Sequence, residues 1–244
     1  MRDAIRLIAD LHTHTSASTH AFSPLRENME AAAEAGLAAV AMTDHGPTLP
    51  DAPHLWHFQT MLRVLPETLC GVRLLKGAEA NAIDFAGGLD LPARELARMD
   101  FVVASMHTQC LTPGTFREHT ETWLALAANP LVDCLGHSGQ PEYPYDHDAV
   151  VRACRDSGCL IEINNNSFSV RPGSRENCLD IAARCAEHGV PVAVNSDAHW
   201  AGQIGRADEA LALLAEIGFP EELILNADRG RLAAWFARRK RIAV

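Results

Sequence analysis

Lysine is scarce in this 244-residue chain, which contains only Lys76 and Lys240. The formal net charge is -10, the wrong sign for a surface that must replace the counterions of nucleic-acid phosphates. The one basic cluster, residues 238–241, stands near the C-terminus, where cations at a helix end are favoured locally. We therefore expect a small substrate and no nucleic-acid partner.

Long hydrophobic runs are also missing. No segment approaches the ~18 uninterrupted apolar residues of a membrane helix, and the first residues lack the pattern of a secretory signal. The seven cysteines include no Cys-x-x-Cys pair, and an odd number is untypical of a disulfide framework. These absences predict buried thiols, a cytoplasmic location and no membrane partner, and they leave the oligomeric state open.

Short apolar runs alternate with longer segments rich in Ala and Leu, a pattern typical of repeated β-then-α units around a parallel sheet. The expected strands are residues 5–9, 38–42, 72–75, 101–104, 131–135, 159–163 and 190–194. The expected helices are residues 24–35, 56–65, 115–127, 148–156, 174–187, 207–216 and 221–239, with long loops at 46–57 and 164–173. No linker divides the chain, and about 250 residues is an ordinary length for one α/β barrel. The sequence therefore predicts an α/β fold with one domain over residues 1–244.

Histidines and carboxylates follow six of the seven expected strands. In chain order they are His12, His14, His20, His45, Glu79, His107, His137, Asp197 and His199. The carboxyl ends of parallel strands meet at one edge of a sheet, so these side chains are expected to converge. Imidazole nitrogen and carboxylate oxygen are the usual ligands of zinc, manganese and iron. The number of ligands exceeds what one ion needs, and the pattern predicts a cluster of divalent metal ions.

Three carboxylates near these positions have less certain roles. A single polar residue at a strand end more often forms hydrogen bonds than binds a metal, so only the joint pattern favours ligation. Asp10 is open between a metal ligand, a partner that orients His12, and a turn cap. Asp44 is expected to orient a ligand or stabilise a turn, and Glu162 to form hydrogen bonds near the site.

Six ordered segments together resemble the polymerase and histidinol phosphatase (PHP) family. They are Asp10-Leu-His-Thr-His14, Thr43-Asp-His-Gly46, Gly77-Ala-Glu79, Ser105-Met-His107, Gly136-His137 and Asn195-Ser-Asp-Ala-His199. More narrowly, residues 17–20, 44–47, 51–58 and 162–165 look like the bacterial YcdX-type phosphatase subgroup. Ser138 departs from that subgroup, in which proline is frequent at this position, and the departure affects the expected loop shape rather than the ligands.

The resemblance implies a distorted (β/α)7 TIM-like barrel that holds three divalent metal ions, with zinc expected and manganese or iron as alternatives. It also implies three sets of ligands. The first ion would be held by His12, His14, Glu79 and Asp197, the second by Glu79, His107 and His137, and the third by His20, His45 and His199.

The predicted function is therefore that of a metal-dependent phosphatase, which cleaves a phosphate monoester of a small molecule. The hypothesis is that a metal-activated hydroxide attacks phosphorus in line, because metal ions lower the pKa of bound water from about 15.7 toward ~7. Glu79 and Asp197 are the predicted catalytic residues. No Gly-x-Ser-x-Gly elbow, phosphate-binding Gly-Lys loop or cysteine nucleophile motif occurs in the sequence.

Two rival functions stay open at this point. An amidohydrolase-like enzyme that cleaves C-N or C-O bonds typically uses a metal-bridging lysine, which Lys76 is not obviously placed to supply. A metal-binding PHP module without catalysis would have lost ligands, and none is missing.

Four further side chains are left open between substrate binding and a structural role. His54 and His57 either line the pocket or pack in a surface loop around Trp56. Arg171 and Arg175 either clamp a phosphate through paired donors or, for Arg175, form an ordinary first turn of a helix.

Overall fold

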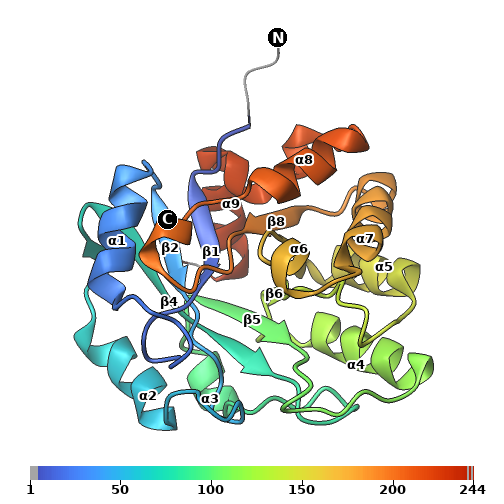
Figure 1. Ribbon diagram of the computed structural model, residues 1–244, viewed down its shortest axis with the longest axis horizontal. Helices are drawn as coiled ribbons and strands as arrows, with labels where there is room; N and C mark the ends of the chain where they lie inside the picture. Colours follow the sequence, from blue (N-terminus) through green and yellow to red (C-terminus); the bar gives the residue numbers. More distant parts are fainter. Residues whose placement is uncertain (1–4, 241, 243) are drawn as a thin grey trace.

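Seven parallel strands curl into a nearly closed barrel in the computed structural model, which describes residues 5–240, 242 and 244 (Figure 1). They are β1 (Ala9–Thr13), β2 (Ala39–Met42), β4 (Val72–Asn81), β5 (Phe101–Ser105), β6 (Cys134–Leu135), β7 (Leu160–Asn164) and β8 (Val192–Asn195). Each pairs with the next in chain order, and a short strand β3 (Thr68–Leu69) pairs antiparallel with the start of β4. The prediction of a distorted seven-unit α/β barrel is confirmed.

Helices surround the strands (Figure 1). They are α1 (Leu25–Glu34), α2 (Leu55–Val64), α3 (Ala93–Leu96), α4 (Phe116–Ala128), α5 (His147–Ser157), α6 (Ser167–Val170), α7 (Ser174–His188), α8 (Asp208–Glu216) and α9 (Arg229–Arg239). Three 3-10 turns follow β8, namely η1 (Ala201–Gln203), η2 (Glu221–Leu223) and η3 (Leu225–Ala227). Within the described part of the chain, every helix is too short or too polar to cross a membrane.

The helix ends follow from local sequence. Helix α4 begins at a capping box in which the Thr115 side chain accepts from the Glu118 amide and Glu118 reaches back to the Thr115 amide. Helix α5 begins at Asp146, whose carboxylate accepts from the Ala149 amide, and it ends at Gly158 in the left-handed conformation. These signals explain why both helices lie close to their predicted positions.

The strand carrying the first two histidines lies further along the chain than predicted. The prediction ended at residue 9, where β1 begins. The strand contains two buried polar residues, Asp10 and His12, so it does not form the apolar run by which strands were predicted. Its pairing with β2 also shifts register between Asp10 and Thr13, an irregularity of the kind that re-aims side chains next to active sites. Strand β4 likewise continues past the predicted residue 75, so Glu79 lies on the strand itself.

The predicted final helix over residues 221–239 is wrong in its first half. The chain there forms η2 and η3, and α9 starts only at Arg229 behind an Asp228 cap. The predicted loop at 164–173 contains the short helix α6, and the predicted loop at 46–57 ends at the start of α2.

The barrel interior is apolar at one end and polar at the other. Side chains alternate along a strand, so Leu75 and Glu79 share one face of β4, and Leu160 and Glu162 share one face of β7. Leu75 and Leu160, which lie nearer the amino ends of their strands, belong to a core cluster that includes Trp235 of α9. Helix α9 therefore closes the amino end of the barrel, and the buried carboxylates lie toward the carboxyl end.

The seam between the first and last strands is bridged by the side chain of Asn226, which lies in η3 and is fully buried. Its Nδ2 donates to the carbonyl oxygens of Ala9 in β1 (2.8 Å) and Val194 in β8 (2.6 Å). Its Oδ1 accepts from the Val194 amide at 3.0 Å, and the Ile8 amide donates to its carbonyl oxygen. The backbone is extended at Ile224 and Asp228 and departs from helical angles at Asn226, so the predicted continuous helix is broken at this segment.

Replacement of Asn226 by leucine is expected to lower the free energy of unfolding by about 2–4 kcal/mol, because several buried backbone groups each lose a partner at about 1–3 kcal/mol. Urea denaturation would measure the change. Arg229→Ala, at an exposed neighbouring position, is the control and is expected to change stability by less than about 0.5 kcal/mol. Equal midpoints for the two variants would contradict the bridging role.

Candidate metal centre

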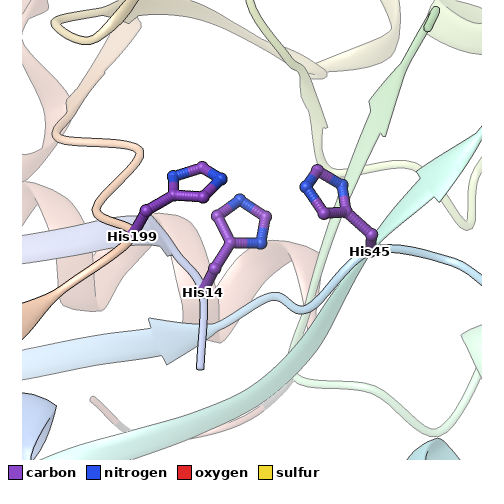
Figure 2. A group of neighbouring side chains, drawn as sticks. All are labelled: His14, His45 and His199. Carbon is purple, nitrogen blue, oxygen red and sulfur yellow. The ribbon is translucent and has the colours of Figure 1, made fainter. Parts of the chain in front are cut away.

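The nine predicted ligands converge at the carboxyl end of the barrel. Figure 2 shows three of them, His14, His45 and His199, whose rings face a common space although they come from distant segments. Two further sets of three residues each bring their donor atoms within 4.8 Å of one another. One set is His12, His14 and Glu79, and the other is His45, Glu79 and His107. The remaining predicted ligands, His20, His137 and Asp197, contact members of these groups.

Glu79 lies at the centre of the cluster and is fully buried. Its Oε2 lies 3.4 Å from His12 Nε2 and 3.6 Å from His14 Nε2. Its Oε1 lies 2.8 Å from His137 Nε2 and 3.5 Å from His107 Nε2. His45 Nδ1 lies 2.7 Å from the same Oε2. Oε2 therefore faces three histidines and Oε1 faces two others, an arrangement suited to a ligand shared by two cations.

A second convergence involves histidine nitrogens alone. His20 Nε2 lies 2.9 Å from His199 Nε2 and 3.3 Å from His45 Nε2. Two nitrogens bound tetrahedrally to one zinc ion at 2.0–2.1 Å would be about 3.3 Å apart. The spacing of these nitrogens thus fits a single small cation.

The hydrogen bonds of the rings also fit metal ligation. His12 Nδ1 lies 2.8 Å from Glu162 Oε1, and His107 Nδ1 lies 2.7 Å from Asn81 Oδ1. The Nε2 atoms of both rings and Oε2 of Glu79 are buried without a hydrogen-bond partner. Buried polar atoms are normally paired, and a metal-bound histidine normally donates its other ring nitrogen to a carboxylate or carbonyl. These residues therefore fit divalent cations.

Neighbouring groups hold the pKa values of two buried carboxylates low. Burial alone would raise the pKa of Glu79, but His12, His45 and His107 hold it well below its usual range. The pKa of Asp197 is also held well below its usual range, by His12, His14 and Arg171 against the effect of burial. Buried ionised groups need compensating charge, so the interior of this site favours cations.

Glu162 organises the cluster without facing the pocket. Its Oε1 accepts from Asn195 Nδ2 as well as from His12 Nδ1, both at 2.8 Å. Its Oε2 accepts from the His137 amide at 2.7 Å and from Asn164 Nδ2 at 3.0 Å. Four donors surround this side chain, and only an ionised carboxylate can accept from all of them. The predicted hydrogen-bonding role of Glu162 is confirmed.

Asp10 caps a turn and does not approach the ligand cluster. Its carboxylate accepts from the amides of Ser196 and Gly205, at 3.1 and 2.9 Å, and from the Ser196 hydroxyl. These bonds hold the segment after β8, which carries Asp197 and His199, against β1. Of the three roles left open for Asp10, the structure supports the turn cap.

Asp44 anchors the loop that follows β1. It accepts from the Thr15 amide at 2.8 Å and from the Ser18 hydroxyl at 2.9 Å. His57 Nε2 lies 3.1 Å from its other oxygen, so the His57 ring contacts Asp44. His54 caps α2 by accepting from the Trp56 amide. Of the two alternatives for His54 and His57, these contacts support the structural role around α2 and Trp56.

Two of the predicted ligands have a backbone conformation that is rare outside glycine. The φ angles are 31° at His137 and 54° at Asp197. The His137 amide donates to Glu162, and the Asp197 amide donates to the His12 carbonyl, so residues of the same cluster hold both conformations. Such strain is concentrated at functional sites.

A pocket of about 620 Å³ opens over the cluster. Its wall includes Leu49, Pro50, Val170 and Arg171 in addition to predicted ligands. Arg171 Nη1 lies 3.5 Å from Asp197 Oδ2, whereas Arg175 in the first turn of α7 forms an ion pair with Glu216. Arg171 therefore remains a candidate for binding a phosphate in the pocket. Arg175 pairs with Glu216 outside the pocket, so the prediction that it binds phosphate is wrong.

Comparison with known proteins places the chain in a family. A PHP domain profile matches residues 10–166, more than half of the sequence. The chain belongs to the PHP domain family. A probable phosphatase of Acetivibrio thermocellus is 45% identical over 236 residues, which cover 97% of this chain and 98% of that protein. A probable phosphatase of Caldanaerobacter subterraneus subsp. tengcongensis is 46% identical over 244 residues, covering 99% and 96% respectively.

A solved structure shares the fold at much lower identity. Histidinol phosphate phosphatase from Lactococcus lactis, crystallised with zinc, L-histidinol and phosphate, has a TM-score of 0.59 at 18% identity. The likeness covers 87% of this chain and 94% of that chain. The predictions of a PHP-family enzyme and of a metal-dependent phosphatase are confirmed. The narrower YcdX-type subgroup stays a prediction.

Replacement of Glu162 by glutamine is expected to weaken metal binding about 10- to 100-fold, the usual cost of losing a partner that orients a ligand. The NH2 group of the new amide would face one of the four donors that now bind Glu162, and the His12 ring would lose the hydrogen bond that fixes its position. Competition with a chromophoric chelator would measure the affinity. Glu187→Gln, at an exposed position, is the control. An unchanged affinity in the Glu162 variant would show that the ligands do not depend on it.

Proposed function

We propose that this chain is a trinuclear metal-dependent phosphatase that hydrolyses the phosphate monoester of a small molecule. The observation that carries the proposal is the position of Glu79, whose two oxygens face different sets of histidines. One of these histidines, His45, also belongs to the convergence of three histidines. Six of the nine proposed ligands, including Glu79, lie in buried positions at one end of the barrel. This arrangement offers donors for three ions.

The proposed ligand sets follow the contacts. His12, His14 and Asp197 would share the first ion with Oε2 of Glu79, since His14 Nε2 lies 3.0 Å from Asp197 Oδ1. His107 and His137 would share the second ion with Oε1. His20, His45 and His199 would hold the third. Divalent ions bound there would lower the pKa of water and neutralise charge on phosphoryl oxygens.

Asp197 links the metal ligands to the substrate pocket. Its Oδ1 faces His14, and its Oδ2 accepts from Asn164 Nδ2 at 3.2 Å and lies 3.5 Å from Arg171. The guanidinium of Arg171 is therefore fixed beside the ligand cluster and lines the pocket. Guanidinium groups bind phosphoryl oxygens through paired donors, so Arg171 is placed to hold the phosphate against the site.

The pocket is consistent with a small substrate. Its volume of about 620 Å³ is in the range of ordinary ligand pockets, and Leu49, Pro50 and Val170 offer an apolar wall for the organic part. Lysine is not among the described residues that line it, which disfavours the amidohydrolase-like alternative with a bridging lysine carbamate. The complete set of nine ligands disfavours a module without catalysis.

Removal of metal by a chelator is expected to abolish phosphate release from a panel of phosphomonoesters, and added zinc or manganese is expected to restore it. His12→Ala and Asp197→Ala are each expected to lower kcat/KM by at least about 100-fold, or ~3 kcal/mol of transition-state stabilisation. Phosphate release would be followed with a colorimetric assay, and bound metal by mass spectrometry.

Arg175→Ala is the matched control, because Arg175 follows the pocket segment but pairs with Glu216 outside it. This variant is expected to keep full activity. Undiminished activity in His12→Ala and Asp197→Ala, or in the chelated enzyme, would overturn the proposed function.

A further inference from the structure

His20 differs from the other proposed ligands in its surroundings. Its side chain is 43% exposed, compared with 20% for His199 and 6% for His45, its partners in the histidine convergence. It lies between β1 and α1, outside any helix or strand. Neither the sheet nor the core therefore fixes the position of its ring.

Asp51 supplies the missing constraint. Its Oδ2 lies 2.6 Å from His20 Nδ1, and its carbonyl oxygen accepts from the Thr19 amide at 3.1 Å. The Nδ1 atom donates to this carboxylate, so Nε2 carries the lone pair and points at His45 and His199. The carboxylate thus fixes both the orientation and the tautomer of the ring.

The loops that carry the two residues are held together next to the barrel by Asp44, which accepts from Thr15 and Ser18, and near their tips by Asp51. Asp51 belongs to the segment between β2 and α2, and His20 to the segment between β1 and α1. The described contacts between Asp51 and the His20 loop are the His20 pair and the backbone and hydroxyl contacts of Thr19. By contrast, His12 is fixed by the fully buried Glu162. The third ligand set therefore depends on an exposed contact, and the first set on a buried one.

We propose that Asp51 is a positioning residue that sets the affinity of the metal position formed by His20, His45 and His199. This position is the weakest and most exchangeable of the three, because it needs two exposed side chains to be ordered before it can bind. The inference rests on the proposed function, since it requires three metal positions. It predicts that the enzyme passes between states with two and three ions as the free metal concentration changes.

The test is a titration of metal stoichiometry. Full-length protein is equilibrated with zinc buffered over a range of free concentrations, and bound zinc per chain is measured by mass spectrometry after rapid desalting. The wild-type chain is expected to lose one ion at higher free zinc than the other two. Asp51→Ala is expected to lose that one ion at about tenfold or more higher free zinc than the wild type, with the other two ions unaffected.

Two further variants sharpen the result. Asp51→Asn keeps an acceptor for His20 Nδ1 but removes the charge, so its affinity is expected to lie between those of wild type and Asp51→Ala. Asp156→Ala removes an exposed carboxylate that pairs with Arg155 outside the metal pocket, and it is expected to match the wild type. Circular dichroism of each variant checks that the fold is retained.

The outcomes separate the two proposals. Fewer than three ions in the wild type at saturating zinc would overturn the proposed trinuclear function, whatever Asp51 does. Three ions in the wild type with an unchanged titration in Asp51→Ala would overturn the role of Asp51 alone. Loss of all three ions together in that variant would also contradict it, because the effect would not be confined to one position.

Discussion

The buried carboxylate of Glu79 is the constraint on which the rest of the site depends. A charge inside a barrel is costly unless it is compensated, and the groups within reach of its oxygens are histidine rings, which hold its pKa below the usual range. Cations bound between these rings and Glu79 would supply compensating charge without requiring protonated rings. The surrounding structure, from Glu162 beneath the cluster to the strained backbone at Asp197, holds the donors in place for them.

The barrel makes this arrangement possible because its two ends differ. Alternation along β4 and β7 places apolar side chains in the lower barrel and carboxylates on the same face near the top, and α9 closes the lower end. The seam bridged by Asn226 lies directly below the segment that carries Asp197 and His199. The stability of the barrel and the geometry of the ligands therefore depend on the same pair of strands.

Much of this could be predicted from the sequence, since histidines and carboxylates at strand ends indicate where side chains converge. The convergence of the nine residues and the barrel followed from that pattern and the family resemblance. Other features lay beyond it. Strand β1 contains the polar residues Asp10 and His12 and was therefore not predicted at its true position, and the bridging role of Asn226 at the seam goes with a break in the predicted last helix. Asn81, which orients His107, was missed, although its spacing of two from Glu79 on the same strand was a signal.

The central proposal is that the chain holds three metal ions, two of which share the Glu79 carboxylate. Anomalous diffraction from crystals of the zinc-loaded protein, recorded on both sides of the zinc absorption edge, tests it directly. We expect three anomalous peaks, two flanking the Glu79 carboxylate and one among His20, His45 and His199. Fewer than three peaks, or the absence of a peak next to Glu79, would contradict the proposal.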